Sequence, residues 1–275
     1  MRRTSGEAIS PLGKASDYPE RDDPGLLFAM PRARAREALG IEGVLPFRGS
    51  DFWTAYELTW LDPRGKPQVA VARFEVPADS PRIVESKSLK LYLGSFAFET
   101  LDRRELARRV QRDLAQACDA GVTVELAPVS ADLAAEPASP PGESLDDLEV
   151  DVGRYDPEPA FLSASGPDVE EALHSALFRS CCPVTGQPDY GDVLIRYRGP
   201  RIDRRGLLRY LVSYRRHAAF HEACVERIFV EVLQRCTSRG LTVYARFLRR
   251  GGIEINPFRS NFEPVPTAPE RSVRQ

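Results

Sequence analysis

Apolar and polar side chains alternate along residues 51–76, which is the pattern of β-strands with two different faces. The alternation is broken by DPRGKP at residues 62–67, where two prolines and a glycine are typical of a turn. The pattern therefore predicts a β-hairpin in this part of the chain.

Between residues 101 and 121 the apolar period becomes that of a helix. The apolar positions that share one helical face are Leu106, Val110, Leu114 and Ala117. Asp102 precedes this face as a predicted N-cap, and Gly121 follows it as a predicted stop. The segment VTVELAPV at residues 122–129 then predicts a strand.

The second half of the chain shows the same order of patterns. Residues 192–214 predict a hairpin with a longer turn, residues 220–240 an amphipathic helix, and residues 241–250 a strand. The two helix endings are alike, because CDAGVTV in the first half corresponds to CTSRGLTV in the second. This similarity predicts two copies of one unit, each with a hairpin, helices and then strands.

These patterns assign the chain to the α+β class, with antiparallel sheets and helices on one face. We expect one copy in residues 1–129 and the other in residues 150–275. The connection between them, residues 130–149, is rich in proline, alanine and acidic side chains and predicts an exposed segment. Residues 263–275 predict a loose tail.

Charge and hydropathy limit the partners of the protein. The 275 residues carry a formal net charge of −2, which disfavours direct binding to nucleic acid through phosphate neutralisation. The polar N-terminus lacks the apolar core of a signal peptide, and no apolar run approaches the ~18 residues that span a bilayer. We therefore expect a cytoplasmic protein without nucleic-acid or membrane partners.

Five cysteines at irregular spacing do not suggest a disulfide framework, and three of them are most simply buried thiols: Cys118, Cys224 and Cys236. The other two, Cys181 and Cys182, are adjacent and precede Asp189. A carboxylate that curls back to a thiol can take its proton and later return it. Spacing alone favours a structural turn here, and it does not distinguish Cys181 from Cys182.

The segment HAAFHE places His217 and His221 four residues apart on one helical face, with Glu222 and Cys224 close by. This spacing suits zinc. The order is not His-Glu-x-x-His and there is no Cys-x-x-Cys, so the pattern alone favours coincidence over a metal site.

Two basic segments complete the candidates. ESKSLKLYLGSF at residues 85–96 spaces Lys87 and Lys90 for one helical face, which alone is typical of an amphipathic helix with solvated lysines. RRGGIEINPFRSN at residues 249–261 suits either phosphate binding or a tight turn between strands. No G-x-G-x-x-G is present, so a Rossmann cofactor domain is not indicated.

Taken together, ESKSLKLYLGSF, CPVTGQPDYG, FHE and RRGGIEINPFRS resemble, in this order, the motifs of the NADPH-dependent 7-cyano-7-deazaguanine reductases. These are the nitrile reductases of queuosine biosynthesis. LGKASDYP near the N-terminus and WTAYELTWLDPRGKPQVAV further on resemble the long, two-copy form of the family. The resemblance covers nearly the whole chain and is weakest in residues 130–149 and in the C-terminal tail.

The resemblance implies roles for three residues in catalysis. The family's thiol lies seven residues before its aspartate, which selects Cys182 over Cys181. Cys182 would add to the nitrile carbon to form a covalent thioimide, and Asp189 would first accept and then donate the proton. His221 would assist proton transfer or shape the pocket. Two NADPH would then reduce the nitrile to a primary amine.

The resemblance also implies binding residues. The substrate, a deazapurine nitrile, would contact Val84, Glu85, Ser86, His221 and Glu222. The two carboxylates among these would accept the N–H groups of the ring edge. NADPH would contact Ser86, Lys87, Arg250 and Gly251, whose cationic groups and backbone amides suit phosphate. No metal is implied.

The fold implied by the resemblance is the tunnelling fold, with two tandem ββααββ copies. The N-terminal copy would supply the Glu-Ser-Lys motif and the C-terminal copy the thiol. We expect a homodimer whose sheets close into a barrel, since closure removes exposed strand edges.

Two alternatives remain open at this point. A zinc-dependent, GTP-cyclohydrolase-like enzyme of the same fold would use Cys182, Cys224 and either His217 or His221. A non-catalytic purine-binding or tRNA-modification partner would carry an inert thiol. The joint presence of Cys182, Asp189 and His221 argues against such a binder, which would need only the carboxylates.

Overall fold

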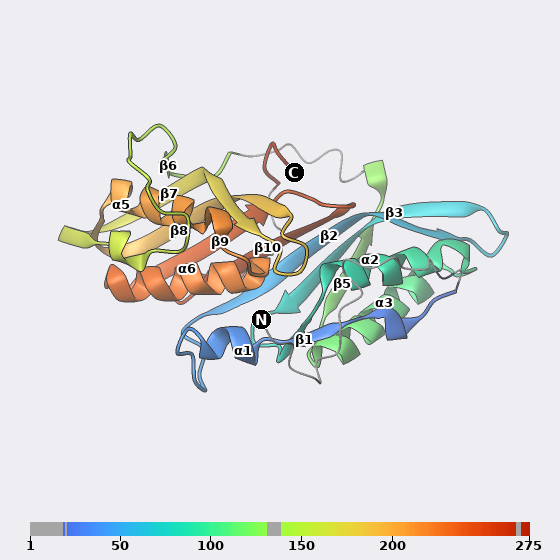
Figure 1. Cartoon of the computed structure of the whole chain (residues 1–275). Helices are drawn as coiled ribbons and strands as arrows, with labels where there is room; N and C mark the ends of the chain where they lie inside the picture. Colours follow the sequence, from blue (N-terminus) through green and yellow to red (C-terminus); the bar gives the residue numbers. More distant parts are fainter. Residues whose placement is uncertain (1–18, 20, 131–138, 268–270) are drawn as a thin grey trace.

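The computed structural model describes residue 19 and residues 21–130, 139–267 and 271–275 (Figure 1). The N-terminal half contains β1 (Ala29–Pro31), α1 (Ala33–Glu37), β2 (Arg48–Leu61), β3 (Pro67–Pro77), β4 (Arg82–Val84), α2 (Ser86–Gly94), α3 (Arg103–Cys118) and β5 (Thr123–Ala127). The C-terminal half contains β6 (Glu143–Ser144), β7 (Ala164–Cys181), β8 (Pro188–Ile202), α5 (Arg204–Ser213), α6 (His221–Arg235), β9 (Gly240–Phe247) and β10 (Ile253–Ser260). None of the described helices is long and apolar enough to cross a membrane.

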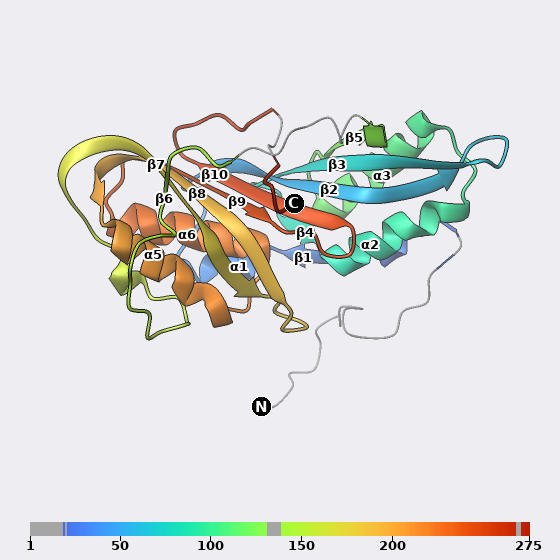
Figure 2. The same ribbon diagram turned by 90° about the horizontal axis from the view of Figure 1, so that it is seen from above.

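One eight-stranded sheet runs through both halves, in the order β5-β3-β2-β10-β9-β8-β7-β6. All neighbouring strands in it are antiparallel except β6 and β7, which are parallel. Strand β10 pairs on one side with β9 and on the other with β2, so that the last strand of the C-terminal half lies beside a strand of the N-terminal half (Figure 2). The α+β class with antiparallel pairing is therefore confirmed.

Both pairs of helices pack on the same face of this sheet. Ile255 and Arg259 lie on one face of β10 because they are four residues apart. Ile255 belongs to the core beneath α2 and α3, whereas Arg259 pairs with Val243, which belongs to the core beneath α5 and α6. Figure 1 shows the two helix pairs at opposite ends of the molecule, α2 and α3 against the N-terminal strands and α5 and α6 against the C-terminal ones.

The predicted hairpin at residues 51–76 is confirmed as β2 and β3, joined by a turn in which the Asp62 N–H donates to the Lys66 carbonyl at 2.9 Å. The predicted N-cap is confirmed as well, since the Asp102 carboxylate accepts hydrogen bonds from the Arg104 and Glu105 N–H groups at 2.8 and 2.9 Å. The predicted stop at Gly121 is wrong. Helix α3 ends at Cys118, and Asp119 adopts the left-handed conformation there, which aspartate tolerates better than most residues.

The second predicted hairpin, residues 192–214, is also wrong. Strand β8 ends at Ile202 and pairs with β7, a strand that the apolar pattern did not predict. The residues expected to return as a strand form α5 instead, with Asp203 as its N-cap. The helix expected at residues 220–240 is present as α6, but it ends at Arg235. With β7 included, the elements from β7 to β10 follow the implied order ββααββ, after the two-residue strand β6.

Two segments expected to be loose are packed. Leu145, in the predicted connection, is fully buried in the C-terminal core, and the Asp146 carboxylate accepts a hydrogen bond from the Ser175 hydroxyl at 2.6 Å. At the C-terminus, Gln275 is buried and its Nε2 donates to the Asn256 side chain at 2.8 Å. The expectation of an exposed segment is therefore wrong for these residues, while residues 131–138 and 268–270 lie outside the described parts of the chain.

Candidate active site

Cys182 lies in the turn between β7 and β8. Its N–H donates to the Gln187 carbonyl at 2.8 Å, and its own carbonyl accepts from the Gly186 N–H at 2.9 Å. Gly186 has a φ of 71°, a conformation that glycine adopts without strain. This closed turn places Asp189 at the start of β8, so that Cys182 and Asp189 line the same cavity.

The surroundings of Cys182 favour its thiolate. Burial opposes ionisation, but hydrogen bonds from the Thr185 hydroxyl and N–H, the Val184 N–H and the Arg250 guanidinium outweigh it and lower the pKa of the thiol. A thiol with a lowered pKa is a better nucleophile near neutral pH. Donors of this turn, together with Arg250, therefore favour the thiolate form of Cys182.

Three further side chains converge on this cavity from different elements. Asp189 is almost fully buried, and its Oδ1 lies 2.9 Å from an Arg250 nitrogen in the β9–β10 turn. The same oxygen lies 3.4 Å from Nε2 of His221, the first residue of α6. The sheet brings β8 and the β9–β10 turn together, and α6 places its N-terminal residue against them.

Glu222 follows His221 in the first turn of α6. It is 3% exposed, and its Oε1 accepts no hydrogen bond from the described residues. Burial, followed by the nearby Asp51 carboxylate, raises the pKa of Glu222, while His221 and Arg32 act in the opposite direction. A buried carboxylate oxygen without a donor is a natural acceptor for the N–H groups of a ligand.

The cavity around Cys182 has a volume of about 20 Å³ and adjoins two larger ones. One, of about 510 Å³, shares Glu222, Phe220 and Pro183 with it. The other, of about 200 Å³, shares Ser86, His221 and Arg250 with it. Val84 and Ser86 line the cavity around Cys182, which we call the central cavity, so the N-terminal half contributes to the same site.

The 200 Å³ cavity carries the residues that the sequence suggested for NADPH: Ser86, Lys87, Arg250 and Gly251. It also contains Lys90, which was not among those candidates. The Lys90 Nζ lies so close to Gly251 that a Cβ at residue 251 would come within 2.4 Å of it. A glycine there, with φ of 57°, lets the lysine approach the backbone of the turn. Cationic side chains and a glycine backbone fit the phosphates of a dinucleotide.

Glu85 is placed differently from the other predicted substrate residues. It is the N-cap of α2, and its carboxylate accepts hydrogen bonds from the Lys87 and Ser88 N–H groups at 2.8 and 2.9 Å. Its flanking residues, Val84 and Ser86, line the central cavity. In this arrangement the Glu85 carboxylate holds the helix that carries Lys87 and Lys90.

The residues of the zinc alternative do not come together. Neither His217 nor Cys224 lines the central cavity, and no group of three metal-ligating side chains occurs among the described residues. Burial raises the pKa of the Cys224 thiol to about 12. The adjacent cysteine is also separate from the site, because the Cys181 Sγ donates to the Arg215 carbonyl at 3.6 Å.

Comparison of the chain with known proteins shows its family. A family model described as a nitrile reductase, 7-cyano-7-deazaguanine-reductase N-terminal region, matches residues 18–126, and a QueF-like protein model matches residues 188–265. The chain is 54% identical over 269 residues to an NADPH-dependent 7-cyano-7-deazaguanine reductase of Burkholderia vietnamiensis, covering 97% of this chain and 98% of that protein. It is 55% identical over 261 residues to the reductase of the same name in Burkholderia multivorans, covering 94% and 95%.

Proposed function

Because the chain belongs to the family of NADPH-dependent 7-cyano-7-deazaguanine reductases, we propose that it reduces the nitrile of 7-cyano-7-deazaguanine to the primary amine, using two NADPH per nitrile. The observation that carries the proposal is that four side chains line one cavity. They are the Cys182 thiol, whose pKa is lowered, the buried carboxylates of Asp189 and Glu222, and His221. The product, 7-aminomethyl-7-deazaguanine, belongs to queuosine biosynthesis.

Cys182 is the nucleophile in this mechanism. Its proton passes to Asp189, and the sulfur forms a C–S bond to the nitrile carbon while the proton moves on to the nitrile nitrogen. The product of this step is a neutral thioimide held on Cys182. The Thr185, Val184 and Arg250 donors that lower the thiol pKa also make the sulfur a good leaving group later in the reaction.

Bound NADPH would supply one hydride in each of the two reduction steps, and the first of these hydrides is matched by a proton delivered to nitrogen. The C–S bond then breaks and Cys182 leaves as thiolate, which gives a protonated imine. The second hydride converts this imine to the amine, and a second proton restores the Cys182 thiol. Asp189 is the proton donor nearest the sulfur, and His221, 3.4 Å from its Oδ1, returns protons to it from the adjoining cavity. Lys87, Lys90 and Arg250, which line the 200 Å³ cavity, would bind the phosphates of the nucleotide.

Substrate orientation rests on Glu222. Its unpartnered Oε1 accepts the ring N–H groups, and the adjacent His221 lines the same cavity. Glu85 contributes through the cap that fixes Val84 and Ser86 at the cavity wall. A homodimer, a cytoplasmic location and the division into copies at residues 1–129 and 150–275 stay predictions.

The test is intact-protein mass and near-ultraviolet absorbance after the protein is mixed with 7-cyano-7-deazaguanine in the absence of NADPH. We expect a one-to-one adduct with the wild type and with Cys181→Ala, and none with Cys182→Ala. Adding NADPH should discharge the adduct. A wild type that forms no adduct and leaves NADPH unconsumed would refute the proposal.

A further inference from the structure

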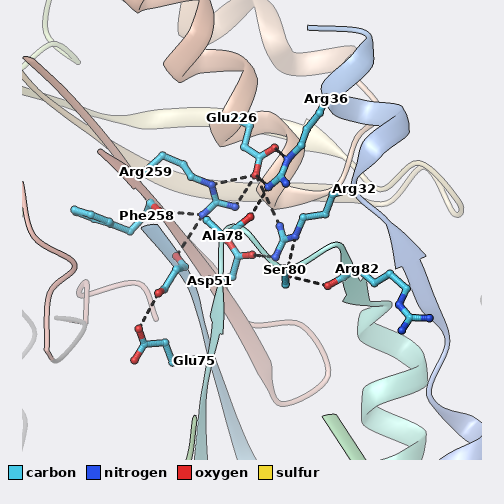
Figure 3. A network of polar contacts seen from close by, with 11 residues as sticks. Arg32, Arg36, Asp51, Glu75, Ala78, Ser80, Arg82, Glu226, Phe258 and Arg259 are labelled. Carbon is cyan, nitrogen blue, oxygen red and sulfur yellow. Dashed lines mark hydrogen bonds and ion pairs between the residues drawn. The ribbon is translucent and has the colours of Figure 1, made fainter. Parts of the chain in front are cut away.

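A second cluster of charged residues lies behind the site, where four elements meet (Figure 3). Arg32 and Arg36 come from the segment that contains β1 and α1, Asp51 from β2, Glu226 from α6 and Arg259 from β10. All five residues are buried, with exposed fractions between 0 and 8%. We call these five residues the arginine cluster.

The cluster is densely bonded. Glu226 accepts hydrogen bonds from Arg36 at 2.8 and 2.9 Å and from Arg259 at 2.9 and 3.1 Å. Asp51 is paired with Arg259 at 2.8 Å on one oxygen and with Arg32 on the other. Ser80 accepts from the Arg32 Nε at 3.1 Å. The cluster thus ties the N-terminal segment to α6 and to the centre of the sheet.

The charges of the cluster do not cancel. Three guanidinium groups face two carboxylates, so the cluster carries one excess positive charge in a buried place. A buried charge without a counter-charge is costly. Glu222 lies one turn before Glu226 on the same face of α6 and lines the 510 Å³ cavity together with Arg32, so a negative charge on Glu222 would partly offset this excess.

We propose that Arg32 is a positioning residue whose guanidinium offsets the Asp51 carboxylate and so favours the ionised form of Glu222 for substrate binding. The inference rests on the proposed function, because it concerns the carboxylate that receives the substrate ring. An ionised Glu222 accepts two N–H donors, whereas a protonated one presents an O–H toward the same donors and loses part of the match.

Other charged groups also face Glu222. His221 precedes it on α6 and Glu226 follows it, Asp51 approaches from β2, and the central cavity adds Cys182, Asp189 and Arg250. Asp51 opposes the ionisation of Glu222, and Arg32 favours it. Removing the charge of Arg32 should disturb the cluster least. The ion pair of Asp51 with Arg259 remains, and so do those of Glu226 with Arg36 and Arg259.

The test is equilibrium binding of 7-cyano-7-deazaguanine between pH 5.5 and pH 9, measured by calorimetry in a Cys182→Ser background that prevents covalent capture. Removing the positive charge in Arg32→Met raises the pKa of Glu222. The ionised fraction of a carboxyl falls about tenfold for each pH step of one below its pKa, so we expect binding about tenfold weaker at the acid end and recovery toward the parent affinity at pH 9. Arg32→Lys should keep the parent profile.

Arg34→Met is the matched control, since Arg34 lines the same cavity from the same segment but is exposed and does not belong to the cluster. It should leave the pH profile unchanged. A folded Arg32→Met protein whose affinity matches the parent, or is weakened equally at every pH, would overturn the inference and leave the proposed function intact. If the parent fails to bind the nitrile at any pH, the proposed function falls and this inference falls with it.

Discussion

Glu222 and Glu226 are both buried carboxylates on one face of α6, a single turn apart, yet their surroundings are opposite. Glu226 accepts hydrogen bonds from two arginines, and although burial opposes ionisation, Arg259 and Arg36 lower its pKa. Glu222 has an oxygen without a donor among the described residues, and burial raises its pKa. Glu226, whose hydrogen bonds are all formed within the protein, fixes the helix, whereas Glu222 keeps hydrogen-bonding capacity for a ligand.

Removing Glu226 should have the largest effect on folding. Glu226→Gln leaves three guanidinium groups with one carboxylate, and loss of one partner from a buried charge pair costs about 3–5 kcal/mol. We expect a decrease of that size in the free energy of unfolding, measured by urea denaturation. Glu222→Gln, the same substitution one turn earlier, is the matched control and should destabilise the protein much less, because the Glu222 Oε1 accepts no hydrogen bond from the described residues. Equal losses in both variants would contradict the distinction between the two carboxylates.

The cluster also shows where sequence patterns stop being informative. The Asp102 cap was predictable because its acceptors lie two and three residues away. Arg36 and Glu226 are 190 residues apart, and no local period signals their pairing. Strand β7 was missed for a related reason: bulges interrupt its pairing with β8, and its first residues are largely exposed, so that it lacks the regular alternation of β2.

In the active site, spacing alone favoured a structural turn around Cys182, and it was the family resemblance that named the residues and their expected roles. Cys182, Asp189, His221, Glu222, Ser86 and Arg250 line one cavity, as the motifs implied together. Glu85 instead caps α2, a role that its position before the helix allows but that the motif does not reveal. Lys90 was noticed as a helical neighbour of Lys87, but its approach to Gly251 depends on the packing of α2 against the β9–β10 turn.

Glu222→Gln should have the next largest effect, and it should fall on substrate binding. Replacing the acceptor by an amide removes a charge-assisted hydrogen bond worth about 1.5–3 kcal/mol, so we expect the Kd for the nitrile to rise about 10- to 100-fold. The KM for NADPH should change little, because Glu222 does not line the cavity that contains Lys87 and Lys90. Parallel increases for both ligands would indicate a general distortion of the site.

The pH dependence of the stability of Glu222→Gln should reveal the raised pKa of Glu222. A carboxyl whose folded pKa lies above its ordinary value of 4.5 contributes stability at low pH that is lost as pH rises through the folded pKa. Relative to the wild type, Glu222→Gln should therefore gain stability as pH rises above about 4.5. Thermal unfolding from pH 4 to pH 8 checks this, and a difference in Tm that does not grow with pH would contradict it.

Two buried cysteines also differ in their surroundings, and here the expected effect of a substitution is smallest. Cys224 is buried with a pKa of about 12, whereas the Cys182 thiolate is held by donors of its own turn. Thr185→Val removes one of several such donors, so the thiol pKa should rise and alkylation of Cys182 by iodoacetamide at pH 7 should slow about three- to tenfold. Thr185→Ser keeps the hydroxyl and should restore the rate.

The alkylation is best followed in a Cys181→Ala background, so that Cys182 is the reactive thiol that remains. Burial raises the pKa of Cys118 to about 11 and that of Cys236 to about 12, which keeps both slow at pH 7. The rate measured against pH gives the thiol pKa directly. If Thr185→Val leaves this pKa unchanged, the backbone N–H groups and Arg250 suffice to hold the thiolate, and the hydroxyl acts only in shaping the turn.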